Sequence, residues 1–180
     1  MGKAYFPMFV DISTKKIYCV GGGTIAARRV KTLVKFADDI TVIAPKICDR
    51  MWEMLGNPKV HFQECSVTEA DVENGMLDLA DMVLAATNDH ELNAAIVTWC
   101  RGRKILVNTC DDKTNCDFYF PSVTEVDGVI IGLNSGGESP AKVRKVREML
   151  EERLSKFGIH GKIKKEGDTN GRSKIDKHTV

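Results

Sequence analysis

Three consecutive glycines, Gly21, Gly22 and Gly23, are the residues whose type and spacing point most directly to chemistry. They follow a short apolar stretch at residues 16–20 and precede a helical pattern at residues 24–36. The first glycine permits a tight turn, and the third lets the backbone approach a phosphate closely. Helix amides and the positive end of the helix dipole would then face that anion. The spacing predicts a loop that holds a dinucleotide pyrophosphate, although such a loop can also be an ordinary turn.

The second expected strand, residues 40–44, ends without the acidic residue that usually holds a ribose hydroxyl in dinucleotide-binding folds. The chain continues instead with Pro45 and Lys46, and no arginine stands there to favour a 2′-phosphate. The sequence therefore determines the choice between NAD and NADP only weakly, and NAD is the cofactor that we expect.

Polar residues follow two further expected strands, at residues 87–89 (TND) and 108–112 (NTCDD). Ligands of doubly wound sheets lie beyond the carboxyl ends of the strands, so these segments should share one crevice with the glycine loop. Asp111 is the candidate catalytic residue, because a partly desolvated carboxylate beside a nicotinamide can take up a proton as hydride leaves. The alternative is that Asp111 or Asp112 merely caps a loop.

The four histidines are weaker candidates. His90 could act as a base, but the first turn of a helix is an equally good place for a histidine without a role. His61, His160 and His178 fall on a strand, near a helix end and in the tail, and we expect no function for them.

Strand and helix patterns alternate through the first part of the chain. Apolar strands are expected at residues 16–20, 40–44, 60–64, 81–86 and 104–108. Helices are expected at residues 24–36, 46–55, 90–101 and, as a short one, from residue 68. This alternation predicts an α/β fold, a Rossmann-type doubly wound parallel sheet with helices on both faces.

The pattern changes in the second part of the chain. Residues 118–124 and 129–134 are typical of two strands joined by a tight turn, a β-hairpin outside the alternating scheme. Its apolar strands need a cover, and in a short protein a second copy commonly supplies it, so we expect a homodimer. Ser139 and Pro140 then cap and start a helix over residues 141–157.

These patterns divide the 180 residues into four parts. We expect an NAD-binding Rossmann domain at residues 1–115, a dimerisation hairpin at 116–139, a C-terminal helical segment at 140–158 and a polar, flexible tail at 159–180.

Composition indicates a cytoplasmic protein. Hydrophobic residues make up 43% of the chain, yet no apolar run approaches the roughly 18 residues of a membrane span, and the N-terminus is too poor in apolar residues for a secretion signal. The six cysteines include no Cys-x-x-Cys pair, so we expect reduced thiols and no structural metal. No nucleic-acid or membrane partner is expected.

The net charge of +1 conceals an asymmetry along the chain. Residues 141–180 hold 12 Lys and Arg against 6 Asp and Glu, whereas residues 1–140 hold 14 against 19. Part of the excess lies in the first two turns of the expected C-terminal helix, at Lys142, Arg144, Lys145 and Arg147. This face is either simply solvated or a landing surface for a multiply anionic ligand.

Six segments together carry a more specific signal than the glycine loop alone. They are residues 5–9 (YFPMF), 21–29 (GGGTIAARR), 85–89 (AATND), 108–111 (NTCD), 118–122 (FYFPS) and 134–140 (NSGGESP). In this order they resemble the dinucleotide-binding module of the siroheme synthase and precorrin-2 dehydrogenase family, over roughly residues 3–155. The resemblance implies an NAD-dependent oxidation of precorrin-2 to sirohydrochlorin, with ferrochelation to siroheme in some members.

The resemblance also implies roles for individual residues. Asp111 takes the position of the family's essential carboxylate. By the resemblance, Thr24, Ile25, Pro45 and Lys46 line the dinucleotide. With the glycine loop and the sheet-edge residues above, the expected cofactor-binding set is Gly21, Gly22, Gly23, Thr24, Ile25, Pro45, Lys46, Thr87, Asn88 and Asn108. The expected substrate-binding set is Ser135 and Gly136 at the substrate entrance, and Arg144, Lys145 and Arg147 for the acid groups of the macrocycle.

The implied partners are tetrapyrroles, precorrin-2 and sirohydrochlorin, with Fe²⁺ as a further substrate for a chelatase, and a second subunit bound through the hairpin. Relatives usually continue into a longer helical domain, whereas the helical pattern here fades near Phe157, so chelatase activity is less secure than dehydrogenase activity. Two alternatives stay open. One is a dinucleotide-sensing module without catalysis, and the other is a chelatase for Fe²⁺ or Co²⁺ in which Asp111 accepts pyrrole protons.

Overall fold

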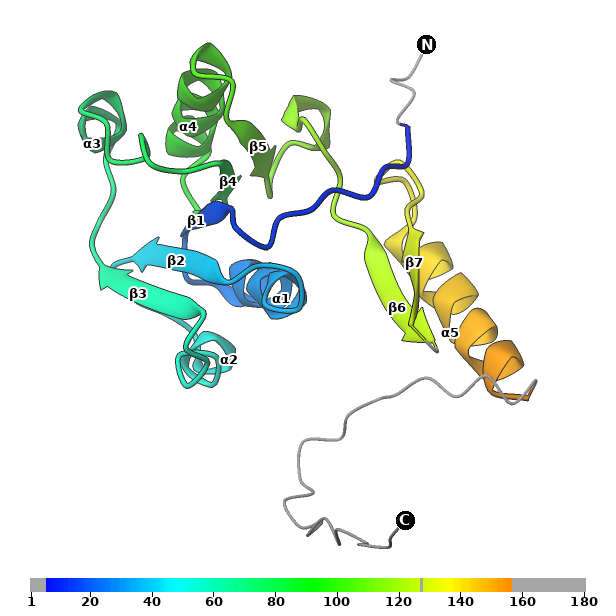
Figure 1. The fold of residues 1–180 in the computed structure, drawn as a ribbon. Helices are drawn as coiled ribbons and strands as arrows, with labels where there is room; N and C mark the ends of the chain where they lie inside the picture. The colour runs from blue at the N-terminus through cyan, green and yellow to red at the C-terminus, as the bar shows by residue number, and fades with distance from the viewer. Residues whose placement is uncertain (1–5, 127, 157–180) are drawn as a thin grey trace, which may run out of the picture.

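The computed structural model describes residues 6–126 and 128–156. Its main layer is a five-stranded parallel sheet in the order β3-β2-β1-β4-β5 (Figure 1). The strands are β1 Lys16–Val20, β2 Asp39–Ala44, β3 Val60–Glu64, β4 Met82–Ala85 and β5 Leu106–Thr109. The predicted doubly wound sheet is confirmed. From β1 the chain first adds strands on one side (β2, β3) and then on the other (β4, β5), and ligands of such folds bind at this switch point between β1 and β4.

Two helices cover one face of this sheet (Figure 1). They are α1 (Thr24–Leu33) and α2 (Asp49–Trp52), which bury Val30 and Met51 in one apolar cluster with Ile17 of β1. Residues Ala26 and Ala27 are fully or almost fully buried, and their small side chains let α1 lie close to the sheet. The start of α1 is thereby held at the end of β1.

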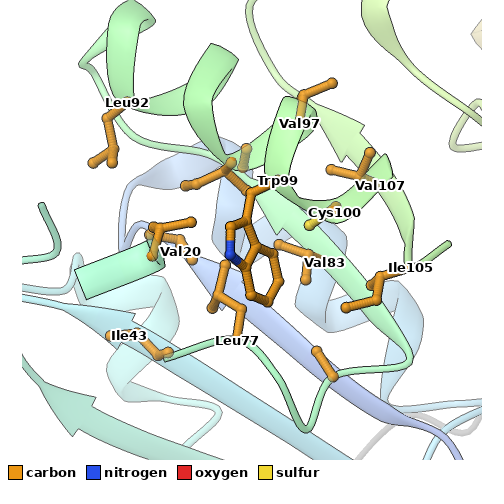
Figure 2. Close-up of a cluster of buried hydrophobic side chains, with 14 residues drawn as sticks. Val20, Ile43, Leu77, Val83, Leu92, Val97, Trp99, Cys100, Ile105 and Val107 are labelled. Atoms are coloured by element: carbon orange, nitrogen blue, oxygen red, sulfur yellow. The ribbon is translucent and has the colours of Figure 1, made fainter. Parts of the chain in front are cut away.

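The other face is covered by α3 (Glu69–Glu73) and α4 (His90–Gly102), as Figure 1 shows. Their apolar side chains form a second cluster in which Trp99 lies near Leu77 and Val83 (Figure 2). A buried side chain of this size typically contributes roughly 3–5 kcal/mol to stability. This packing holds α4 firmly on the sheet, which matters because the first turns of α4 carry residues of the site.

The helix predicted at residues 46–55 is shorter in the structure, where only α2 is helical. Residues 46–48 instead lie against the glycine loop, and the Cys48 N–H donates to the Gly22 carbonyl at 2.9 Å. The close approach of these two loops prevents a regular helix from starting at residue 46.

Residues 118–121 are irregular, although the sequence predicts a strand there. Phe118 and Phe120 pack against the cluster beneath α1, with ring centroids 5.8 Å apart. The Phe118 carbonyl accepts a hydrogen bond from the side chain of Asn108 at 2.6 Å. This segment is therefore fastened to the main sheet, and the hairpin begins only after it.

The hairpin consists of β6 (Ser122–Val126) and β7 (Val129–Leu133), an antiparallel pair. Helix α5 (Pro140–Lys156) lies along it, apart from the five-stranded sheet (Figure 1). Ser139 Oγ accepts from the Lys142 N–H at 3.3 Å, which agrees with the predicted start of this helix. The predicted tail at 159–180, with His160 and His178, lies outside the described residues.

All six cysteines lie within the described ranges, and none forms a disulfide. Burial raises the pKa of Cys19 and of Cys100 to about 12, so these two thiols stay protonated at neutral pH. No helix within residues 6–126 and 128–156 is long and apolar enough to cross a membrane.

Candidate functional site

A first cleft of about 580 Å³ lies at the carboxyl ends of β1, β2 and β4. This volume is within the range of roughly 300–1,000 Å³ that is usual for small-molecule sites. Its lining comes from the glycine loop, the end of β2 and the segments after β3 and β4: Val20, Gly21, Gly22, Gly23, Ile43, Ala44, Pro45, Lys46, Ile47, Cys48, Cys65, Ser66, Val67, Ala86, Thr87, Asn88, Asp89 and Leu92.

Two of the glycines are required by the close approach of neighbouring backbone. Gly21 has φ +120°, and a Cβ there would lie 2.2 Å from the Ala86 carbonyl oxygen. A Cβ on Gly22 would lie 2.4 Å from the carbonyl oxygen of Lys46. Only glycine lets the loops after β1, β2 and β4 meet in this way.

Gly23 differs from these two because open space surrounds it. A Cβ at this position would meet no described heavy atom within 4 Å. Gly23 is also the N-cap of α1 and has no side chain to cap the helix, whose first turn contains no acidic residue. The uncapped amides, the positive helix end and the open space fit the pyrophosphate of a dinucleotide.

A second, smaller cleft of about 190 Å³ lies where the first turns of α4 approach the end of β5. It is lined by His90, Ala94, Thr109, Asp111, Asp112 and Asn115. Asp89 caps α4, since its Oδ1 accepts from the backbone N–H groups of Glu91 and Leu92 at 3.0 and 3.1 Å. That cap fixes the helix start from which His90 projects.

Three donors converge on the Asp111 carboxylate, whose side chain is 15% exposed. Oδ2 accepts from Asn93 Nδ2 at 2.8 Å and lies 2.7 Å from Nδ1 of His90. Oδ1 accepts from the hydroxyl of Thr109. The alternative that Asp111 merely caps a loop does not agree with these contacts, because its hydrogen-bond partners are side chains from α4 and β5.

These contacts decide the charge of Asp111. Burial alone would raise its pKa, but the hydrogen bonds from Asn93, Thr109 and His90 outweigh burial and lower the pKa to about 2. The carboxylate is therefore ionised at neutral pH and can only accept hydrogen bonds. It follows that Nδ1 of His90 carries the hydrogen of this contact, and in the tautomer with one ring hydrogen the lone pair lies on Nε2.

Asn93 connects the two clefts, and the sequence did not point to it. Its side chain is essentially buried at 1% exposure. Oδ1 accepts from the backbone N–H and the hydroxyl of Thr87, at 3.2 and 2.8 Å, while Nδ2 donates to the Thr87 carbonyl and to Asp111. One amide thus links Thr87 of the first cleft to Asp111 of the second. The only available signal was a polar residue among the apolar positions of α4.

The structure brings most of the predicted cofactor-binding residues to the first cleft, with three exceptions. Thr24 and Ile25 are exposed in the first turn of α1, beside Gly23, but do not line the cleft. Asn108 is 2% exposed and lines neither of the two clefts. Its side chain points instead to the Phe118 carbonyl, so its cofactor-binding role is not supported and its contact is a structural one.

The predicted substrate entrance lies close to the loop that follows Asp111. A Cβ on Gly137 would be 3.2 Å from Cδ of Lys113, so residues 134–139 lie against that loop. Ser135 Oγ accepts from the Ser139 N–H at 3.0 Å, and Gly136 has φ +67°. The local turn that contains Ser135 and Gly136 is therefore well defined.

Two of the three predicted substrate-binding cations on α5 are paired within the helix. Arg147 donates to both carboxylate oxygens of Glu151, at 2.7 and 2.9 Å, and Arg144 lies 3.7 Å from Glu148. Lys145 has no such partner among the described residues.

Within residues 6–126 and 128–156, no group of three or more His, Cys, Asp or Glu side chains could hold a metal ion.

Comparisons with known proteins agree with this architecture. A family model described as "Putative NAD(P)-binding" matches residues 8–122. The "Probable multifunctional siroheme biosynthesis protein HemA" of Ruminiclostridium josui is 38% identical over 146 residues, which are 81% of this chain and 27% of that protein. Siroheme synthase of Blochmanniella pennsylvanica is 34% identical over 177 residues, which are 98% of this chain and 35% of that protein.

Among solved structures, "SirC, precorrin-2 dehydrogenase" has a TM-score of 0.67 at 23% sequence identity, over 83% of this chain and 71% of that chain. At this identity the likeness shows a shared fold. The chain spans about a third of the length of the curated relatives named above, 27% and 35%. The chain belongs to the NAD(P)-binding domain family that is found in siroheme synthases.

Proposed function

We propose that this chain oxidises precorrin-2 to sirohydrochlorin with NAD⁺, as the dehydrogenase domain of siroheme biosynthesis. The observation that carries the proposal is the Asp111–His90 pair, linked through Asn93 to the cleft that fits a dinucleotide. The names of the similar proteins, siroheme synthase and precorrin-2 dehydrogenase, support a tetrapyrrole as the substrate.

The oxidation removes one hydride and one proton from the macrocycle. A dinucleotide held by the glycine loop in the first cleft would supply the hydride acceptor, its nicotinamide ring. The proton passes to Nε2 of His90, while the ionised Asp111 holds Nδ1–H and stabilises the imidazolium that forms. Asp111, with its pKa of about 2, is a poor final proton acceptor. Its role is to stabilise the positive charge on His90. The side chain of His90 is 82% exposed, so it can return the proton to water.

The experiment is an anaerobic assay of NADH formation from precorrin-2 by the wild type and by Asp111→Asn. Removing the carboxylate charge should lower kcat by about 100-fold or more, the usual scale for a lost acid–base group. NAD⁺ affinity, measured by calorimetry, should stay within about twofold, because Asp111 lines only the second cleft.

Asp78→Asn is a matched control, since Asp78 is an exposed acid that pairs with Arg103 and lines neither cleft. Its turnover should equal that of the wild type. Undiminished turnover by Asp111→Asn would remove the assigned role of the carboxylate. Tight NAD⁺ binding by the wild type without any NADH formation would instead favour the dinucleotide-sensing alternative.

We also propose that the acid groups of precorrin-2 bind near residues 134–139 and α5, where Ser135, Lys145 and Arg144 are candidates. The loop of residues 134–139 lies against the segment that follows Asp111, which supports a substrate on that side. Lys145→Gln should raise KM for precorrin-2 more than Arg147→Gln, because Arg147 is already paired with Glu151. Equal effects on KM would contradict this assignment.

Ferrochelatase activity is a second proposal, favoured by the placement of Asp111 and Asp112 in one cleft. The ionised carboxylates there would attract Fe²⁺, the second substrate, while Nε2 of His90 would accept the protons that the pyrrole nitrogens lose as the metal enters the macrocycle. Siroheme formation from sirohydrochlorin and Fe²⁺ without added dinucleotide would support it, and its absence while NADH formation persists would limit the chain to the dehydrogenase step.

A homodimer is the expected assembly, because apolar side chains on the hairpin and α5 are exposed. Val129 is 60% and Met149 is 52% exposed, with Ile130 and Val146 each at 39%. Sedimentation velocity should give twice the mass of the 180-residue chain, and Val129→Glu should shift the equilibrium to monomer. A concentration-independent monomer would contradict the dimer.

A further inference from the structure

The charges along the first cleft are sparse and unevenly placed. Among its lining residues only Lys46 and Asp89 carry charge. Lys46 follows β2, whereas Asp89 follows β4, and these strands flank β1 on opposite sides in the sheet. Asp89 is also occupied as the cap of α4. The β2 side of the cleft therefore has a cation and no carboxylate of its own.

Two other acidic residues lie near the β2 end of the cleft, but neither supplies the missing carboxylate. Glu64 pairs in register with Ala44, and Asp49 starts α2, but neither lines the cleft. In doubly wound folds a carboxylate at the end of the second strand holds the ribose 2′-hydroxyl, and its charge disfavours a phosphate at that position. Within the described cleft no residue performs this exclusion.

The position of Lys46 is fixed, but its ammonium group is free. Its carbonyl lies against Gly22, and the Cys48 N–H donates to the Gly22 carbonyl at 2.9 Å, so the backbone cannot shift easily. Three other lysines of the described chain form ion pairs, Lys15 with Asp81, Lys59 with Asp38 and Lys156 with Glu152. Lys46 lines the cleft without an ion pair to any described residue.

From these observations we propose that the ribose end of the first cleft accepts a 2′-phosphate, with Lys46 as its contact, so that NADP⁺ binds at least as tightly as NAD⁺. Lysine binds phosphate as a point charge, and it needs no special geometry to do so. The inference rests on the proposed function only in requiring that the cleft holds a dinucleotide. Lys46 is then the residue that sets cofactor specificity.

The test is calorimetric titration of the full chain with NAD⁺ and, separately, NADP⁺. Lys46→Gln should weaken NADP⁺ binding by roughly fivefold and NAD⁺ binding by less than about twofold, and the difference should shrink as salt is added. Lys46→Glu should weaken NADP⁺ further. Arg50→Gln is the matched control, because Arg50 is an exposed cation nearby that does not line the cleft, and it should change neither affinity.

Two results would overturn the inference while the proposed function stands. One is NADP⁺ binding by the wild type that is more than about tenfold weaker than NAD⁺ binding. The other is an equal loss of both affinities in Lys46→Gln, which would give Lys46 no part in specificity. If the wild type binds neither dinucleotide, the inference and the proposed function fail together.

Discussion

The two clefts are shaped by different parts of the polypeptide. Backbone shapes the first, because Gly21 and Gly22 let three loops touch and Gly23 leaves space beyond them. Side chains shape the second, where donors from α4 and β5 surround Asp111. The first cleft requires glycines, which have no side chain, and the second requires side chains that donate hydrogen bonds to Asp111. Adding atoms should therefore damage the first cleft, and removing atoms should damage the second.

Gly21→Ala should have the largest effect. The new Cβ would lie 2.2 Å from the Ala86 carbonyl oxygen, at a residue whose φ of +120° already disfavours alanine. We expect a loss of about 3 kcal/mol or more in the free energy of unfolding, together with loss of NAD⁺ binding. Urea unfolding and calorimetric titration measure the two quantities.

Gly23→Ala is the matched variant within the same loop. Its Cβ would meet no described atom within 4 Å, so stability should change by less than about 1 kcal/mol, while NAD⁺ affinity falls because the methyl group enters the phosphate space. If Gly21→Ala kept both its stability and its affinity, the backbone account of the first cleft would be wrong.

Asn93→Ala tests the link between the clefts and should have an intermediate effect. The change removes the buried amide that hydrogen-bonds both Thr87 and Asp111, which should cost roughly 2 kcal/mol in the free energy of unfolding. It also removes a donor that lowers the pKa of Asp111, so that pKa should rise. Carboxyl-carbon NMR of Asp111 and urea unfolding are the measurements.

Thr98→Ala provides the comparison on the same helix, because Thr98 is exposed and its hydroxyl only contacts the Ala94 carbonyl. Its unfolding free energy should stay within about 0.5 kcal/mol of the wild type. An Asn93→Ala protein that matched Thr98→Ala in stability and in the Asp111 titration would disprove the connection between the two clefts.

The smallest predicted effect is the pH dependence of stability that Asp111 confers. Its folded pKa of about 2 lies below its ordinary value of 3.8, so the folded state binds fewer protons than the unfolded state between these values. The contribution, at most about 2 kcal/mol, is complete above about pH 4 and is lost as the pH falls towards 2. The unfolding free energies of the wild type and Asp111→Asn should converge over this interval, and a constant difference would contradict the lowered pKa.

The first cleft was largely predictable because local rules shape it. The spacing of three glycines between an apolar strand and a helix indicates a phosphate loop, and the bounds of β1 and β3 agree with the predicted ranges. Asp111 could be selected because it follows a strand that ends at the same sheet edge. These features depend on neighbours within a few residues, which a sequence displays directly.

The second cleft could be predicted only in part, because its contacts join distant segments. Asn93 and Asp111 are 18 residues apart, and their meeting depends on how α4 packs against β5. His90 could not be distinguished from an idle histidine until the 2.7 Å contact with Asp111 was known. Asn108 lies at the sheet edge but lines neither cleft, because its side chain donates to the Phe118 carbonyl, a contact that the sequence does not display.

A single-turnover reaction tests the central claim most directly. The claim is that NAD⁺ in the first cleft accepts the hydride while His90, beside Asp111 in the second cleft, accepts the proton. Excess protein with bound NAD⁺ is mixed anaerobically with precorrin-2, and the spectra of NADH and sirohydrochlorin are followed together. The account predicts that both products appear in equal amounts with one shared rate constant. Sirohydrochlorin formed without NADH, or no reaction although both ligands bind, would contradict it.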